Sequence, residues 1–133
     1  MDKEKILIVD DDPQLRRGLD IRFRANQYDT AHASDGVSAI SMARKETPDL
    51  IILDLGLPAG DGFTVMERLQ AFADLACVPV IVVTARDPRT NRQRALQAGA
   101  VAFFQKPVDN EELLAAIQQA LRASPTELSS TGV

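Results

Sequence analysis

Short runs of hydrophobic residues alternate with longer, mostly polar segments along this chain. Such runs are typical of buried strands, and they cover about residues 5–9, 28–32, 51–53, 78–83 and 101–105. The second run is short and half polar, which predicts a strand at the edge of a sheet. Between the runs, apolar residues recur at helical spacing, as Leu15, Leu19 and Phe23 do. This alternation predicts an α/β fold, a doubly wound, five-stranded parallel sheet with helices on both faces.

Residues that favour helix starts precede each predicted helix. We expect the N-caps to be Asp12, Ser34, Asp61, Asp87 and Asp109. Pro13 and Pro88 follow two of these caps, at the first helical position, where a missing N–H costs no hydrogen bond. Each helix start is therefore indicated by its own local signal.

The predicted helices differ in how much apolar surface they can bury. The second helix is expected to bury Val37, Ile40 and Ala43. The fourth, at about residues 88–98, has chiefly Leu96 to bury, so it should be one of the less firmly packed elements. The first helix carries a row of arginines, mostly on its predicted outer face: Arg16, Arg17, Arg22 and Arg24.

Composition excludes several classes of protein. A length of 133 residues suits one domain, which we place at residues 1–123, with a tail or linker stub at 124–133. A net charge of −4 argues against nucleic-acid binding, and no apolar segment is long enough to cross a membrane. The single cysteine, Cys77, excludes an intrachain disulfide and is expected to be half-buried. We therefore expect a cytoplasmic protein.

Polar side chains follow four of the hydrophobic runs, at the point where each run ends. They are Asp10 with Asp11, Asp54, Thr84 and Lys106. The carboxyl ends of parallel strands share one edge of a sheet, so these side chains should gather there. Crowded carboxylates attract a hard cation such as Mg²⁺, and lysine and threonine can hold anionic oxygens beside it. The set predicts a metal-assisted phosphoryl site in which a carboxylate accepts the phosphoryl group.

Each of these residues also has an ordinary structural explanation when it is considered alone. Asp10 could cap a helix, Thr84 could end a strand and Lys106 could be a solvated lysine. We favour a shared site because all of them fall at the same predicted edge. Asp61 is interpreted as a helix cap rather than a metal ligand, and His32, the only histidine, as a surface residue rather than a catalytic base.

Six short motifs occur in order at the ends of the predicted elements. They are Asp10-Asp11, Asp54 with the following Leu55-Gly56-Leu57-Pro58, Asp61-Gly62, Thr84-Ala85, Gly99-Ala100 and Lys106-Pro107. Asp54 and Thr84 are 30 residues apart, and Thr84 and Lys106 are 22 apart. In these motifs and spacings, about residues 4–122 resemble the receiver domain of two-component response regulators.

The resemblance implies a flavodoxin-like (βα)₅ fold with strand order 2-1-3-4-5. It implies a signalling switch that accepts a phosphoryl group from the phosphohistidine of a sensor histidine kinase, or from a phosphotransfer protein. The acceptor would be Asp54, and the chain would catalyse only its own phosphotransfer and dephosphorylation, so it is not an enzyme in the wider sense. A homodimer or an effector would use the face formed by the fourth helix, the fifth strand and the fifth helix.

The resemblance also assigns a role to each site residue. Asp11, Asp54 and the backbone carbonyl of Gly56 would bind Mg²⁺, with Asp10 acting through a water molecule. Lys106 would pair with Asp54 in the free form and with a phosphoryl oxygen after transfer.

Thr84 would hydrogen-bond another phosphoryl oxygen and act as a switch together with Phe103, whose ring would turn inward on phosphorylation. A Phe103 ring fixed in the core is the alternative. The Lys106–Pro107 bond is expected to be cis.

Two other functions remain as alternatives. The first is an Mg²⁺-dependent phosphatase-type hydrolase with an aspartyl nucleophile, but it expects a second aspartate where this chain has Gly56. The second is a receiver-like module that binds partners without phosphorylation, which is disfavoured because no site residue is missing.

The lifetime of the phosphoryl group stays open, because Gly56 has no side chain to screen an attacking water. Val101 and Ala102 stand where the family often has acidic residues, which makes the end of the fifth strand more apolar.

Overall fold

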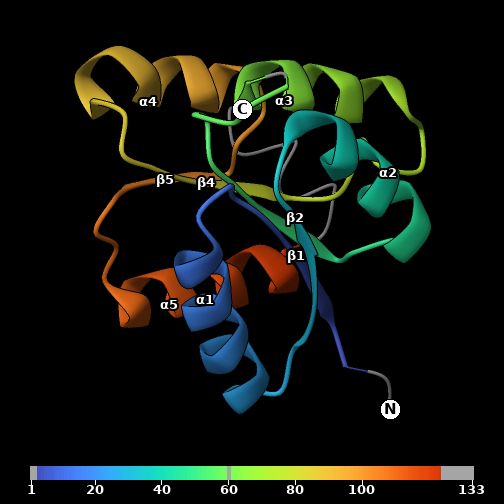
Figure 1. Ribbon diagram of the computed structural model, residues 1–133, viewed down its shortest axis with the longest axis vertical. Helices are drawn as coiled ribbons and strands as arrows, with labels where there is room; N and C mark the ends of the chain where they lie inside the picture. Colours follow the sequence, from blue (N-terminus) through green and yellow to red (C-terminus); the bar gives the residue numbers. More distant parts are fainter. Residues whose placement is uncertain (1–2, 60, 124–133) are drawn as a thin grey trace.

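The computed structural model describes residues 3–59 and 61–123. Its five parallel strands form one sheet in the order β2-β1-β3-β4-β5, which confirms the predicted fold and strand order (Figure 1). The strands are β1 (Lys5–Val9), β2 (Asp29–Ala33), β3 (Leu50–Leu53), β4 (Val80–Thr84) and β5 (Ala102–Gln105). The helices that alternate with them are α1 (Pro13–Ala25), α2 (Gly36–Glu46), α3 (Gly62–Ala71), α4 (Pro88–Gln97) and α5 (Asn110–Arg122). The half-polar strand β2 lies at an edge, as predicted.

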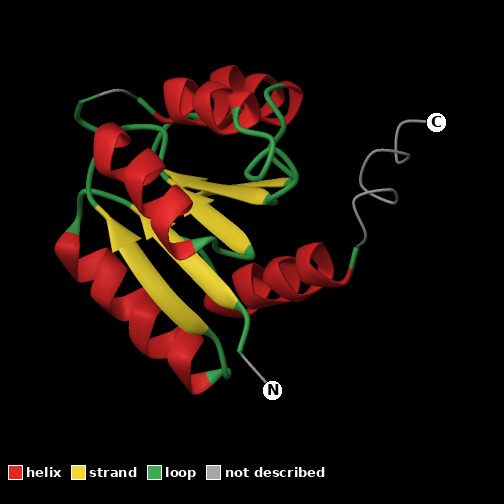
Figure 2. Ribbon diagram, turned by 90° about the vertical axis from the view of Figure 1, so that its right-hand side faces the viewer, coloured by secondary structure: helices red, strands yellow, loops and turns green. Residues whose placement is uncertain are grey.

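Helices cover both faces of the sheet, α1 and α5 on one and α2, α3 and α4 on the other (Figure 1, Figure 2). The strand β1 contributes to both hydrophobic clusters. Ile6 and Ile8 pack toward α1 and α5, whereas Leu7 and Val9 pack toward the other face, and all four are fully buried. A strand covered on both sides needs apolar residues at every position, which is why it is visible in the sequence as an unbroken run.

Aspartate side chains cap the helices, with one difference from the prediction. Four caps are confirmed: Asp12, Asp61, Asp87 and Asp109. The cap expected at Ser34 is wrong, because Asp35 accepts from the Ser38 N–H at 2.7 Å while Ser38 Oγ accepts from the Asp35 N–H at 3.3 Å. This reciprocal pair makes α2 begin at Gly36, one residue later than expected. Val37 is 60% exposed, so its predicted burial is also wrong, because Gly36, Ala39 and Ala43 form the buried face of α2.

Two further predictions of burial are wrong. Leu96 is 38% exposed, and Ala95 takes the inner position of α4 instead. Cys77 is exposed, and Leu75 supplies the buried side chain of its loop. The predicted tail at 124–133 lies outside the described residues. None of the helices in the described part of the chain combines the length and hydrophobicity needed to cross a membrane.

Candidate functional site

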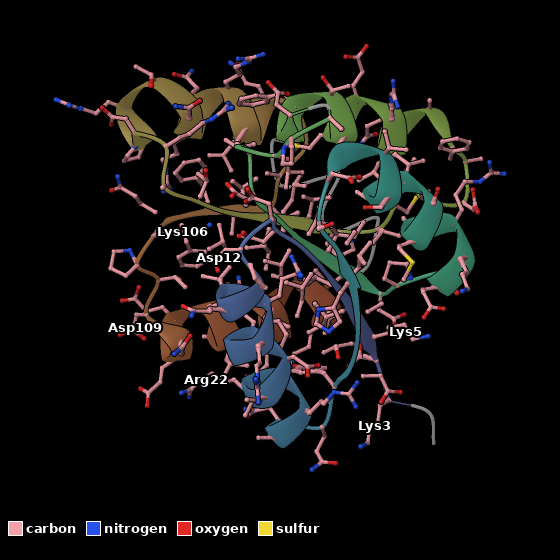
Figure 3. The ribbon with its side chains drawn as sticks, viewed as in Figure 1. Lys3, Lys5, Asp12, Arg22, Lys106 and Asp109 are labelled. Atoms are coloured by element: carbon pink, nitrogen blue, oxygen red, sulfur yellow. The ribbon has the colours of Figure 1, made fainter. Side chains whose placement is uncertain are left out.

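The carboxyl ends of four neighbouring strands carry the predicted site residues. Asp10 follows β1, Asp54 follows β3, Thr84 ends β4 and Lys106 follows β5. The strands are held in register here, since the Lys106 N–H donates to the Thr84 carbonyl at 2.8 Å. Lys106 and Asp12 mark this end of the sheet in Figure 3. Residues that are far apart in the sequence therefore meet at one edge, as the strand pattern predicts.

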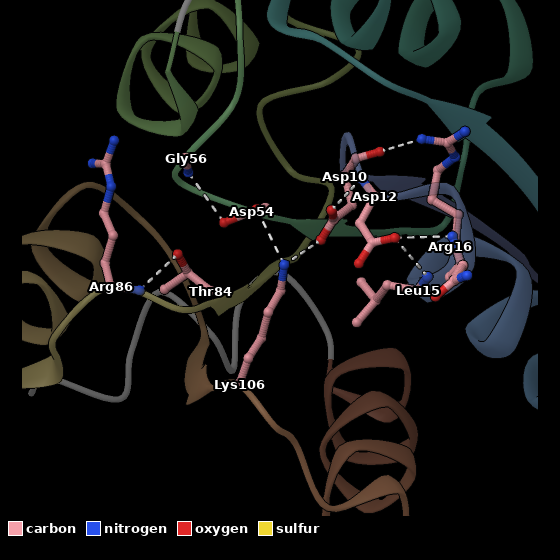
Figure 4. A network of polar contacts seen from close by, with 10 residues as sticks. Asp10, Asp12, Leu15, Arg16, Asp54, Gly56, Thr84, Arg86 and Lys106 are labelled. Carbon is pink, nitrogen blue, oxygen red and sulfur yellow. Dashed lines mark hydrogen bonds and ion pairs between the residues drawn. The ribbon is translucent and has the colours of Figure 1, made fainter.

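The ammonium group of Lys106 joins two carboxylates. Its Nζ lies 2.8 Å from Asp10 Oδ2 and 3.2 Å from Asp54 Oδ2 (Figure 4). The contact with Asp54 was expected from the sequence, whereas the shorter one with Asp10 was not. Burial alone would lower the pKa of Lys106, but the hydrogen bonds and opposite charges of the two aspartates outweigh it and raise this pKa above its ordinary value. Lys106 is therefore a cation at neutral pH.

Asp10 is a buried carboxylate, only 2% exposed. Burial raises the pKa of Asp10, although hydrogen bonds from Lys106 and from the Asp12 N–H act in the opposite direction. The Asp12 N–H donates to Asp10 Oδ1 at 2.9 Å, so both carboxylate oxygens of Asp10 have partners. Because the effect of burial outweighs these two contacts, the negative charge of Asp10 is costly in the free protein. This cost favours the approach of a cation.

Three carboxylates lie close enough to share a cation. One oxygen from each of Asp10, Asp11 and Asp54 lies within 4.8 Å of the others. Asp10 and Asp54 are buried and Asp11 is exposed, so the group opens to solvent at Asp11. A ligand set made only of oxygens suits a hard cation such as Mg²⁺. The residues present therefore fit this ion.

Gly56 lies beside the Asp54 carboxylate. Its N–H donates to Asp54 Oδ1 at 3.1 Å (Figure 4). A Cβ atom at Gly56 would lie 3.8 Å from the same oxygen, in ordinary van der Waals contact. Because Gly56 is exposed and has no side chain, this side of Asp54 stays open to an incoming group.

Comparison with known proteins decides the family. The chain matches the response regulator receiver domain over residues 6–118. It belongs to this family. Among curated relatives, the response regulator PleD of Caulobacter vibrioides is 37% identical over 118 residues, which are 89% of this chain and 26% of PleD. The DNA-binding dual master transcriptional regulator RpaA of Synechocystis is 39% identical over 118 residues, 89% of this chain and 49% of RpaA. The chain thus spans only about a quarter to a half of these relatives.

Solved receiver domains have the same fold. The receiver domain of the sensor histidine kinase PA1611 from Pseudomonas aeruginosa superposes with a TM-score of 0.83 at 28% identity, covering 91% of this chain and 99% of that one. That structure is described as having a magnesium ion coordinated in its active site cleft. The BeF₃-activated receiver domain of RstA from Klebsiella pneumoniae has a TM-score of 0.82 at 28% identity, covering 90% of this chain and 100% of that one. As a receiver domain, this chain is a phosphoacceptor of two-component signalling and not a classical enzyme.

The two residues that are predicted to act as a switch, Thr84 and Phe103, are both buried. Thr84 is 1% exposed, and its Oγ1 accepts a hydrogen bond from the Arg86 N–H at 3.3 Å (Figure 4). Phe103 is 6% exposed and packs in the cluster beneath α2, α3 and α4. Phe103 is thus a buried side chain in this structure, and the turn of its ring on phosphorylation stays a prediction. The Lys106–Pro107 bond is cis, as predicted.

Three other side chains make their contacts outside the cluster of carboxylates. Asp61 caps α3, and His32 lies 3.5 Å from Asp20 on the edge of the sheet, which agrees with the structural roles assigned to them. Arg16 was expected mostly outside, yet it is half-buried and its Nη1 donates to the carbonyl oxygen of Asp10 at 2.6 Å. The only sequence signal for a half-buried Arg16 is that it directly follows Leu15, the first residue of the apolar row of this helix.

Proposed function

We propose that this receiver domain takes a phosphoryl group onto Asp54 from the phosphohistidine of a sensor histidine kinase or a phosphotransfer protein. The arrangement of Asp54 carries this proposal. Its carboxylate follows a buried strand, with one oxygen beside the Lys106 ammonium and the other beside the Gly56 N–H. The two donors hold the two oxygens of the proposed nucleophile in place.

In the proposed transfer, an Asp54 oxygen attacks phosphorus while the phosphorus–nitrogen bond of phosphohistidine breaks. The imidazole leaves with the bonding electron pair, and an acyl phosphate forms on Asp54. The Lys106 ammonium group then pairs with one phosphoryl oxygen, and the Thr84 hydroxyl donates a hydrogen bond to another. These steps rest on positioning and charge, which is how phosphoryl transfer is generally accelerated.

The proposed metal is Mg²⁺, held by the carboxylates of Asp11 and Asp54 and the carbonyl oxygen of Gly56, with Asp10 acting through water. The oxygen cluster of the described residues supports this assignment. When bound, the ion supplies positive charge that offsets the charge of the phosphoryl oxygens. We expect Mg²⁺ to raise the melting temperature of the wild type and not that of Asp11→Ala, which lacks one carboxylate ligand.

We further propose that the signal leaves through the face formed by α4, β5 and α5, to a second copy or an effector. Leu96, in α4, and Val101, directly before β5, are large hydrophobic side chains that are 38% and 36% exposed. We expect the domain to work in the cytoplasm, because its single cysteine suits a reducing compartment. No role in binding nucleic acid or membranes is proposed for residues 1–123.

Acetyl phosphate with Mg²⁺ provides the test of the acceptor. Intact mass should show one added phosphoryl group on the wild type, and the group should be released by alkali. Asp54→Asn is the matched variant, because it keeps the shape of the side chain and loses the nucleophile. If Asp54→Asn gains the same alkali-labile phosphate at the wild-type rate, the assignment of Asp54 is wrong.

A further inference from the structure

The side chain of Arg16 reaches from α1 back to the end of β1. Its Nη1 donates to the backbone carbonyl oxygen of Asp10 at 2.6 Å (Figure 4). The next residue, Arg17, is exposed, whereas Arg16 is only partly exposed. An arginine loses side-chain freedom when it is held in this way, so the contact has to be favourable enough to offset that loss.

The carbonyl held by Arg16 belongs to the peptide bond that joins Asp10 to Asp11. The Asp10 N–H is fixed as well, because it donates to the Ala33 carbonyl at 3.1 Å. The Asp10 carboxylate is held by the Asp12 N–H and by Lys106. Arg16 therefore completes the restraint of Asp10, and it fixes the peptide plane from which Asp11 projects.

The direction of the Asp11 carboxylate depends on this peptide plane. Among the hydrogen bonds and ion pairs found in the described part of the chain, none holds the exposed Asp11 side chain. Its position within the oxygen cluster then depends on its own rotamer and on the direction in which the backbone points its Cα–Cβ bond. A small rotation of the Asp10–Asp11 peptide would move the Asp11 oxygens relative to those of Asp54.

The hydrogen bond from Arg16 uses none of the carboxylate oxygens of the site. Lys106 occupies oxygens of Asp10 and Asp54, so it competes with a cation for them. Arg16 uses the carbonyl oxygen of Asp10 instead. It can stabilise the cluster without taking the place of the ion.

We propose that Arg16 is a positioning residue for the Mg²⁺ site, which it serves by holding the Asp10–Asp11 peptide. This inference rests on the proposed function, in which Asp11 is a ligand of the ion. Groups that orient metal ligands typically change metal affinity by about 10–100-fold when they are removed.

The sign of the effect separates positioning from charge. Arg16→Ala removes a positive charge beside a cation site, so electrostatics alone predicts tighter Mg²⁺ binding. The positioning role predicts weaker binding. Arg17→Ala is the control, since it makes the same change in net charge on the same helix at an exposed side chain.

Calorimetric titration with MgCl₂ at fixed ionic strength tests this. We expect the dissociation constant of Arg16→Ala to rise by about tenfold and that of Arg17→Ala to stay at the wild-type value. Binding by Arg16→Ala as tight as the wild type, or tighter, would overturn the inference. If the alanine variant does not fold, Arg16→Met replaces it, because methionine keeps an unbranched apolar stem and removes the guanidinium with its donors and charge.

Failure of the proposed function gives a different result in the same titration. In that case the wild type and Asp11→Ala bind Mg²⁺ equally, whatever happens at Arg16. A loss of thermal stability in Arg16→Ala with unchanged Mg²⁺ affinity would show a purely structural contact and would also overturn the inference.

Discussion

The guanidinium of Arg94 lies over the ring of Phe63, 3.7 Å from the ring centroid. Arg94 belongs to α4 and Phe63 is the second residue of α3, so the contact joins two helices on the same face of the sheet (Figure 1). Phe63 follows Gly62, which packs against the backbone of Asp54. The stack therefore connects α4 with the segment that follows the proposed phosphoacceptor.

The first prediction concerns the anchoring of α4. This helix has only Ala95 as a buried residue, so the stack should account for a sizeable part of its attachment. Removing the guanidinium in Arg94→Ala should cost about 0.5–1 kcal/mol of cation–π energy. We expect the backbone amides of α4 to exchange faster with deuterium while those of β1 and β3 stay unchanged.

Arg92→Ala is the matched control for this prediction. Arg92 lies on the same helix and is exposed, and its removal changes the net charge equally. Equal exchange rates in Arg92→Ala and Arg94→Ala would show that the stack does not hold α4.

The second prediction concerns Gly62, where the chain after β3 passes very close to the start of α3. A Cβ atom at this position would lie 2.7 Å from the Asp54 carbonyl oxygen and 2.7 Å from Leu55 Cα. Gly62→Ala should therefore lower the free energy of unfolding by about 1–3 kcal/mol, as overpacking against backbone does. Urea unfolding measures this, and phosphorylation by acetyl phosphate should slow because Asp54 is displaced.

Gly18→Ala is the control that changes the same atoms without a clash. Gly18 lies inside α1, and an added Cβ would meet nothing within 4 Å. Alanine favours a helix interior over glycine by up to about 1 kcal/mol, so this variant should be more stable than the wild type. Two variants with equal stability would contradict the account of Gly62.

The third prediction concerns pH. Burial raises the pKa of Asp10, so the folded chain binds a proton at this position more readily than the unfolded chain does. The group therefore adds stability below the ordinary carboxyl pKa and loses this contribution as pH rises through the raised folded-state value. Asp10→Asn does not titrate, so its stability relative to the wild type should increase as the pH rises above about 4, the ordinary carboxyl pKa. Urea unfolding without Mg²⁺ measures this difference, and a flat or falling profile would refute it.

The strands and the location of the site could be predicted because their signals are local. β1 and β3 are covered on both faces, so each appears as an unbroken apolar run. The polar residue at the end of such a run can be read directly, as for Asp54. Parallel strands bring these ends together without any knowledge of side-chain packing.

Helix register was harder, because neighbouring residues can serve as caps. Ser34 and Asp35 are both good N-cap residues, and only the reciprocal bond with Ser38 decides between them. The inner face of α2 is formed by small residues, Gly36, Ala39 and Ala43, which give a weak hydrophobic signal, so Val37 was wrongly expected to be buried.

The contacts that refine the site depend on distances between elements, for which the sequence has no signal. Lys106 Nζ lies closer to Asp10 than to Asp54, and both contacts join side chains that follow different strands. Arg16 reaches the Asp10 carbonyl because α1 packs at one particular height along β1. Hydrophobic periodicity determines which face of a helix is buried, but not where along the strand it lies.

The last prediction concerns the switch between Thr84 and Phe103. In the free protein Thr84 Oγ1 accepts from the Arg86 N–H, and Phe103 is already buried. A phosphoryl group on Asp54 should draw the Thr84 hydroxyl away from Arg86 and so change the surroundings of the Phe103 ring, because a bound group favours the state that it contacts best.

Beryllofluoride with Mg²⁺, a mimic of the phosphoryl group on Asp54, tests this in ¹H–¹⁵N spectra. We expect shifts at Thr84, along α4 and at Phe103, and Thr84→Ala should lose most of those beyond the immediate site. A Phe103 ring that is fixed in the core, which is the alternative, would show only a small change. Shifts confined to the surroundings of Asp54 in the wild type would mean that Thr84 does not transmit the signal to α4 and Phe103.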